Sequence, residues 1–212
     1  DTTKVLSPAC VEFLHELNNR CSSDYEECLE LRKKVFDRRK YGFRSDTESI
    51  RNGDWVVDKS NFNDNLNNRH VEITGPANSK RMVINAFNSG ASGYMLDLED
   101  SMSPSWENVI NGHDNIYHAI RKTIYDAKYD NDGNILKEYT INHGPLPTFF
   151  VRSRGLHMRE YNVLDDNKNP ISATIFDIGT HLFNNGWYLH KNYMGPYLYT
   201  PKLESYEDAC FV

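Results

Sequence analysis

The stretch that decides the fold is SGYMLDLEDSMSP, residues 92–104. Within it, a short apolar run leads directly into three carboxylates, Asp97, Glu99 and Asp100. A buried segment that ends in several acids suits three interpretations: a metal site, a catalytic pair, or a polar strand end that faces water. The rest of the chain has to distinguish between them.

Strand and helix patterns alternate on both sides of this stretch. This alternation is typical of an α/β fold with a parallel sheet. A hairpin with its turn at 131–134 interrupts the series. In the helix predicted at 79–90, one side is expected to carry the apolar residues Met82, Val83, Ala86 and Phe87. We predict strands at 70–76, 92–100, 148–155 and 195–205, and helices at 79–90, 105–126 (interrupted at Gly112), 172–191 and from 205 onward.

The N-terminal third does not show this alternation of strands and helices. Ser7-Pro8 predicts a helix start, and Ser23 with Glu26 forms a capping box that predicts a second helix. Residues 40–68 are polar and aromatic, which indicates an extended loop with short turns. We therefore divide the chain into an N-terminal helical and extended region, 1–68, and an α/β region, 69–212.

The α/β region has three main strands by this count, and its last predicted helix starts at residue 205 of 212. So few parallel strands would leave sheet edges and one face poorly covered. We therefore expect the chain to be incomplete as a folding unit, with a further polypeptide segment or chain completing it.

Polar residues follow each main strand at its C-terminal end, which is where α/β folds place their active sites. The acids of the opening stretch follow the first strand, Arg152 and Arg154 the second, and Lys202 and Glu204 the third. Strand alternation puts both arginines on one face, where guanidinium groups suit a carboxylate ligand. His157 is either a loop residue or a substrate contact. The alternative interpretation of the whole set is a solvated rim.

Composition excludes some classes of partner. The formal net charge is −6 with 24 basic and 30 acidic residues, so nucleic acid is not expected as the main partner. No apolar run approaches the roughly 20 residues that span a bilayer, so no membrane partner is expected. The four cysteines lack metal-binding spacing, and we expect reduced thiols, although an even number also permits disulfides.

Several motifs together resemble malate synthase of the shorter, A-type kind. The resemblance covers nearly the whole chain in order, with small length changes around residues 35–65. The motifs are SPACVEFLHEL (7–17), SDTESIRNGDW (45–55), VEITGP (71–76), RMVINA (81–86), DLEDSMSPSW (97–106), NVINGHDN (108–115), VRSRGLHMRE (151–160) and GPYLYTPKLESYEDA (195–209).

This resemblance implies an N-terminal helical region followed by the first three β/α units of a (β/α)₈ TIM barrel. It also implies the family's reaction in the glyoxylate cycle, in which acetyl-CoA and glyoxylate condense with water to give malate and CoA. Mg²⁺ is the implied cofactor, acting as a Lewis acid. The implied location is peroxisomal, glyoxysomal or cytoplasmic, and secretion is less expected.

The resemblance also implies roles for individual residues. Arg152 matches the family's catalytic arginine, with Arg154 as the second choice, and Arg154 and Lys202 are the expected substrate-binding residues. Glu99 and Asp100 are expected in the outer shell of the metal. The family's direct Mg²⁺ ligands and its catalytic aspartate lie in later segments. We therefore expect no direct metal ligand in this chain and no activity from the chain alone.

Two alternatives stay open. The first is a non-catalytic relative of malate synthase with a structural or binding role. The second is a related barrel lyase that acts on another acyl-CoA.

Overall fold

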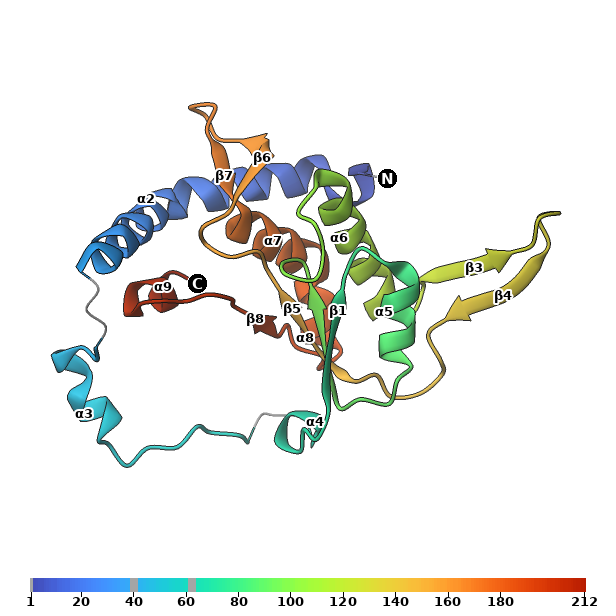
Figure 1. Cartoon of the computed structure of the whole chain (residues 1–212), viewed down its shortest axis with the longest axis horizontal. Helices are drawn as coiled ribbons and strands as arrows, with labels where there is room; N and C mark the ends of the chain where they lie inside the picture. Colours follow the sequence, from blue (N-terminus) through green and yellow to red (C-terminus); the bar gives the residue numbers. More distant parts are fainter. Residues whose placement is uncertain (1, 39–41, 61–63) are drawn as a thin grey trace.

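A four-stranded parallel sheet lies at the centre of the computed structural model, which describes residues 2–38, 42–60 and 64–212 (Figure 1). The strand order is β1-β2-β5-β8. This confirms the predicted α/β class, but the count of three main strands is wrong, because the short first strand is a full member of the sheet. The strands are β1 (Glu72–Pro76), β2 (Gly93–Asp97), β5 (Thr148–Arg152) and β8 (Leu198–Tyr199).

The register of the sheet aligns the ends of its strands. Pro76 pairs with Asp97, Asp97 with Arg152, and Arg152 with Tyr199. Since all four strands run in parallel, these four residues form one row at the C-terminal edge. Neighbours in this row, which are 21, 55 and 47 residues apart in the sequence, therefore meet along this edge.

The two central strands are largely apolar up to their last residues, Asp97 and Arg152, as expected for strands covered on both faces. All five residues of β2 are buried, as are four of the five in β5. Helix α5 (Lys80–Phe87) begins at the Ser79 cap and lays Phe87 edge-on against Tyr94 and Phe149. The buried face of α5 differs from the prediction, because Ile84 is buried whereas Met82 is half exposed.

Helix α6 (Trp106–Ile120) runs without a break through Gly112, so the predicted interruption is wrong. A Cβ atom at this glycine would lie 2.7 Å from Leu98 Cδ2 and 3.3 Å from Ala77 Cβ. Gly112 therefore marks a close approach of the helix to the sheet. The missing side chain serves packing and does not end the helix.

The chain begins with α1 (Thr2–Val5) and then a single long helix, α2 (Pro8–Arg38). The prediction of two separate helices is wrong, because the Ser23 capping signal lies inside α2. No glycine or proline occurs between residues 9 and 38, so nothing in the backbone favours a break. Buried Tyr25 and Cys28 also hold this part of the helix against the rest of the molecule.

The described parts of 42–68 are extended with short helical turns, as predicted, while residues 40, 41 and 61–63 of the predicted loop lie outside the described residues. The turns are η1 (Ser45–Thr47), α3 (Glu48–Arg51) and α4 (Asp64–Asn67).

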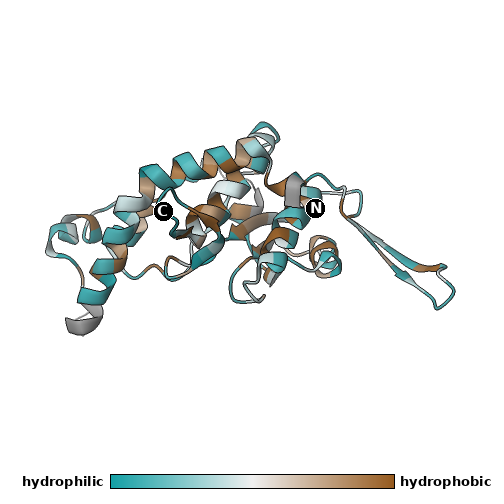
Figure 2. Cartoon of the chain, turned by 90° about the horizontal axis from the view of Figure 1, so that it is seen from above, coloured by the Kyte–Doolittle hydropathy of each residue, from teal (hydrophilic) through white to brown (hydrophobic). Residues whose placement is uncertain are grey.

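Two hairpins leave the sheet. The predicted one, β3 (Tyr125–Tyr129) with β4 (Ile135–Thr140), extends away from the body in both views (Figures 1 and 2). The other, β6 (Arg159–Leu164) with β7 (Pro170–Ser172), was not predicted. It leads into the helical run α7 (Ala173–His181), η2 (Leu182–Gly186) and α8 (Trp187–Lys191), which covers the predicted helix at 172–191.

The last helix is α9 (Tyr206–Phe211), which was predicted from 205 onward, and the Ser205 hydroxyl caps it by accepting the N–H of Asp208. All four cysteines are free, in agreement with the expected thiols. Within the described ranges, no helix combines the length and the apolar character needed to cross a membrane.

Candidate active site

The register places Asp97 and Arg152 side by side at the C-terminal edge of the sheet. Arg152 Nε lies 2.8 Å from Asp97 Oδ1 and Nη2 lies 2.7 Å from Oδ2, a two-point ion pair. Asp97 is fully buried and also accepts the backbone N–H groups of Glu99 and Ser101. These bonds fix the orientation of the guanidinium, and Nη1 of Arg152 takes part in none of them.

The other two acids of the opening stretch surround the same arginine. Asp100 Oδ2 lies 3.1 Å from Arg152 Nη2, and Glu99 Oε2 lies 3.8 Å from Nε. From the end of β8, Lys202 brings its ammonium nitrogen to 2.7 Å from Glu99 Oε1 and 2.9 Å from Asp100 Oδ1. The structure thus brings together four of the five predicted site residues, with Asp97 beneath them.

Glu99 has the most unusual environment of the three acids. Its side chain is only 3% exposed, and neither carboxylate oxygen has a hydrogen-bond partner of regular geometry among the described residues, despite the short ion pair to Lys202. A buried carboxylate without such partners is costly. The loop after β5 packs on it closely, since a Cβ atom at Gly155 would lie 2.9 Å from Glu99 Oε1 and 2.8 Å from the ring of His157.

At Asp97, Arg152, Asp100 and Lys202 the shift in pKa favours the charged form of the side chain. Burial raises the pKa of Asp97, but hydrogen bonds from Arg152 and from backbone N–H groups outweigh it and leave this pKa below its usual value. The hydrogen bond to Asp97 raises the pKa of Arg152 in turn. The pKa of Asp100 is lowered by its hydrogen bond from Lys202, whose own pKa is raised by Glu99 and Asp100.

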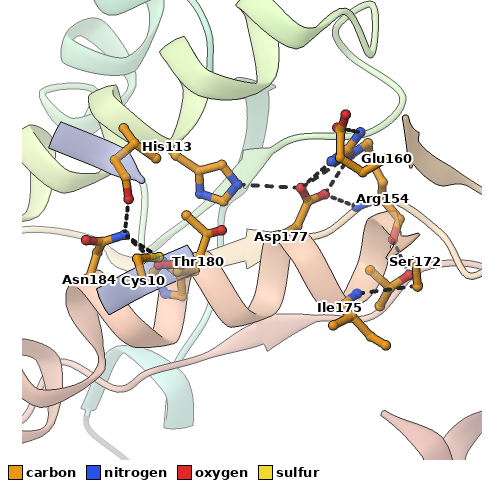
Figure 3. A network of polar contacts seen from close by, with 12 residues as sticks. Cys10, His113, Arg154, Glu160, Ser172, Ile175, Asp177, Thr180 and Asn184 are labelled. Atoms are coloured by element: carbon orange, nitrogen blue, oxygen red, sulfur yellow. Dashed lines mark hydrogen bonds and ion pairs between the residues drawn. The ribbon is translucent and has the colours of Figure 1, made fainter. Parts of the chain in front are cut away.

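Arg154, the fifth predicted residue, lies elsewhere. It is 1% exposed and binds Asp177 of α7 through Nε, Nη2 and its backbone N–H, with Nη2 to Oδ1 at 2.8 Å (Figure 3). Its Nη1 donates to Glu160 of β6 at 2.9 Å, and His113 Nε2 lies 3.5 Å from Asp177. This buried network, which we call the Arg154 brace, fixes the loop after β5. The role predicted for Arg154 in substrate binding stays a prediction.

The prediction that Arg152 and Arg154 share one face is wrong, because β5 ends at Arg152. The two-residue alternation of a strand applies only inside the strand, so it does not extend to Arg154.

Comparison with known proteins gives a consistent result. The family described as "Malate synthase, TIM barrel domain" matches residues 148–212. The chain is 38% identical to "Malate synthase" of Myxococcus xanthus and 34% identical to "Malate synthase A" of Escherichia coli, with 99% and 98% of the chain covered. It is 39% identical to "Bifunctional glyoxylate cycle protein" of Caenorhabditis elegans over 97% of the chain. The chain is a relative of the malate synthases.

This malate synthase relative spans only part of the proteins it matches. It covers 38% of the length of the Myxococcus xanthus and Escherichia coli proteins and 21% of the Caenorhabditis elegans protein. The described residues contain no group of three or more His, Cys, Asp or Glu side chains placed to hold a metal ion.

One residue of the site had no assigned role in the sequence interpretation. Asp97 stood in the quoted stretch as one of three acids, without a task of its own. The signal that identifies it is positional: it is the last residue of a buried strand and lies opposite Arg152 in the neighbouring strand. Asp97 is the residue that holds the Arg152 guanidinium in place.

Proposed function

We propose that this chain supplies part of the catalytic unit of a malate synthase, which joins acetyl-CoA to glyoxylate and releases malate and CoA. The observation that carries this proposal is the geometry of Arg152. Its guanidinium is fixed by Asp97 at the sheet edge, while Nη1 is not used by that pair. An arginine held in advance in this way can stabilise negative charge as it develops on a substrate.

In this reaction the acetyl methyl carbon loses a proton and attacks the aldehyde carbon of glyoxylate, and water then cleaves the thioester. Negative charge gathers first on the thioester oxygen and then on the aldehyde oxygen. We assign Arg152 to bind glyoxylate and to stabilise this charge, and Lys202 to assist in substrate binding. Arg154 is a weaker candidate for substrate contact, since its side chain is committed to the buried brace.

The charge of the site supports a divalent cation. Three carboxylates (Asp97, Glu99, Asp100) face two cations (Arg152, Lys202), which leaves a formal charge of −1 where an anionic substrate has to bind. The carboxylate oxygens of Glu99 are hard donors of the kind that suit the water shell of Mg²⁺. Glu99 and Asp100 would hold that shell, and Mg²⁺ when bound would polarise the aldehyde of glyoxylate.

The proposal includes a completing segment. The four strands would form the first part of a (β/α)₈ barrel, with further sequence closing it and supplying the direct metal ligands and the base. The family match to a TIM barrel domain and the partial coverage of the relatives support this. A peroxisomal, glyoxysomal or cytoplasmic location is also proposed, because several relatives carry the word "glyoxysomal" in their names.

The test uses the longest natural polypeptide that contains these 212 residues. Thiol release is measured with acetyl-CoA and glyoxylate, with and without Mg²⁺. We expect Mg²⁺-dependent release, and a loss on the order of 10²–10³-fold in kcat for Arg152→Ala, the scale for removing one donor to a developing oxyanion. Arg20→Ala, at an exposed arginine of α2, is the matched control and should keep full activity.

Two outcomes contradict the proposal in different ways. Full activity of Arg152→Ala would show that the site is assigned wrongly although the reaction is right. A folded polypeptide that releases no thiol from acetyl-CoA and glyoxylate, with or without Mg²⁺, would favour the non-catalytic alternative.

A further inference from the structure

Lys202 has a strained backbone. Its φ angle is +54°, a left-handed conformation that non-glycine residues adopt only when surrounding contacts enforce it. The same residue places its ammonium group between Glu99 and Asp100. Its side-chain position therefore depends on whatever holds this short segment of backbone.

The contact that holds it comes from the distant helix α2. Arg32 Nη2 donates to the backbone oxygen of Lys202 at 2.7 Å. The same guanidinium binds Asp208 of α9 with Nη2 to Oδ2 at 2.8 Å and Nε to Oδ2 at 3.1 Å. The Arg32 side chain is 12% exposed and that of Asp208 is fully buried, so water competes little with the Arg32–Asp208 bonds.

Asp208 also binds the segment that leads from Lys202 into α9. Its Oδ2 also accepts the backbone N–H of Glu204 at 2.9 Å, and its own N–H donates to the Ser205 hydroxyl at 3.1 Å. Arg32 and Asp208 together thus fix residues 202–208 at both ends. A planar guanidinium can bridge a carboxylate and a carbonyl at once, whereas a lysine in its place offers a single charged point.

We propose that Arg32 is a positioning residue of the site, which acts by holding the backbone of Lys202 so that its ammonium stays on Glu99 and Asp100. The helix that sequence analysis placed outside the α/β region thereby becomes part of the site's support. The importance of this for turnover rests on the proposed function, but the positioning itself can be measured without turnover.

A purely structural role for the Arg32–Asp208 pair predicts something different. The pair would then only attach α2 to α9, where Tyr25 and Phe211 also pack with ring centroids 5.8 Å apart. Its loss would loosen the whole protein and affect all lysines alike. A positioning role predicts a change confined to Lys202.

The experiment compares the acetylation rates of individual lysines by acetic anhydride, read by mass spectrometry, in the longest natural polypeptide and in its Arg32→Gln variant. Lys122 is the internal reference. It also has a positive φ, +56°, and a bonded ammonium, but Lys122 Nζ binds Gly144 O far from α2 in the chain. We expect a severalfold faster rate at Lys202 and an unchanged rate at Lys122. Arg20→Gln is the control on the same helix.

Arg32→Lys covers the case in which Arg32→Gln does not fold, and we expect an intermediate rate at Lys202. The proposal is overturned by an unchanged Lys202 rate in either folded variant, or by equal increases at Lys202 and Lys122. Since acetylation requires no catalysis, these results stand whether or not the polypeptide makes malate, and a failure of the proposed function is seen separately in the thiol-release assay.

Discussion

At the residue scale, two arginines that are two positions apart have opposite environments. Arg152 lies at the sheet edge with its side chain 15% exposed, and Arg154 lies below it at 1%. Each is fixed by one fully buried aspartate, Asp97 or Asp177. Nη1 of Arg152 takes no part in its pair with Asp97 and can donate to a ligand, whereas Nε, Nη1 and Nη2 of Arg154 all donate within the Arg154 brace. Burial and partner geometry, not residue type, therefore separate a candidate catalytic group from a structural one.

The Arg154 brace gives the first prediction at this scale. In Asp177→Asn the shape is kept, but the carboxylate that neutralises buried Arg154 is lost. We expect a loss of about 3–5 kcal/mol in the free energy of unfolding, the scale for breaking a buried ion pair from one side. Urea unfolding at neutral pH measures it. Asp166→Asn, at an exposed aspartate that pairs with His15, should stay within about 0.5 kcal/mol of the parent. A loss below about 1 kcal/mol for Asp177→Asn would show that the brace is dispensable.

At the element scale, helix α6 shows how packing can reverse a helix preference. Alanine in place of glycine inside a helix normally stabilises by about 1 kcal/mol. At Gly112 the added Cβ would meet Leu98 Cδ2 at 2.7 Å, and overpacking of this kind costs about 1–3 kcal/mol. We therefore expect Gly112→Ala to lower the melting temperature.

Gly186 provides the matched control for this prediction. It is also a helical glycine, in η2, but its added Cβ would find no atom closer than 3.9 Å, which is ordinary contact. Gly186→Ala should raise the melting temperature slightly. If both alanines raise the melting temperature, then helix preference and not the contact with Leu98 decides the effect.

The same element scale shows what sequence could predict. The helices at 79–90 and from 205 onward and the strand at 92–100 were predicted from local patterns, because those patterns act within a few residues. The Ser23 capping box was misleading, since capping competes with helix continuation and the buried contacts of Tyr25 favour continuation. The Asp97–Arg152 pair and the Arg32–Lys202 contact depend on sheet register and helix packing, which no local pattern contains.

At the scale of the whole molecule, helix α2 joins the N-terminal region to both loops of the candidate site. Tyr25 donates its hydroxyl to the Leu156 oxygen at 2.7 Å, and Arg32 donates to the Lys202 oxygen. Leu156 follows Gly155, which packs on Glu99. The predicted boundary between residues 68 and 69 stays a prediction, but the N-terminal helix supports the site from across that boundary.

The last prediction concerns the acid stability of the whole molecule. Burial raises the pKa of Asp177, but Arg154 and His113 outweigh it, and Arg152 does the same for Asp97, so both aspartates have a lower pKa in the folded state than the usual 3.8. The unfolded state therefore binds more protons at low pH, and stability that is present above about pH 4 is lost as the pH falls through the lower folded values.

We expect the free energy of unfolding to decrease from about pH 4 towards pH 2, and to decrease less steeply in Asp177→Asn, because that variant has already lost one of the two contributions. Urea unfolding across this range measures both slopes, with Asp166→Asn as the variant that should keep the slope of the parent. Parallel curves for the parent and Asp177→Asn would mean that the brace carries no protonation-linked stability. A shallower slope would show that one buried aspartate under the candidate site helps to set the acid limit of the fold.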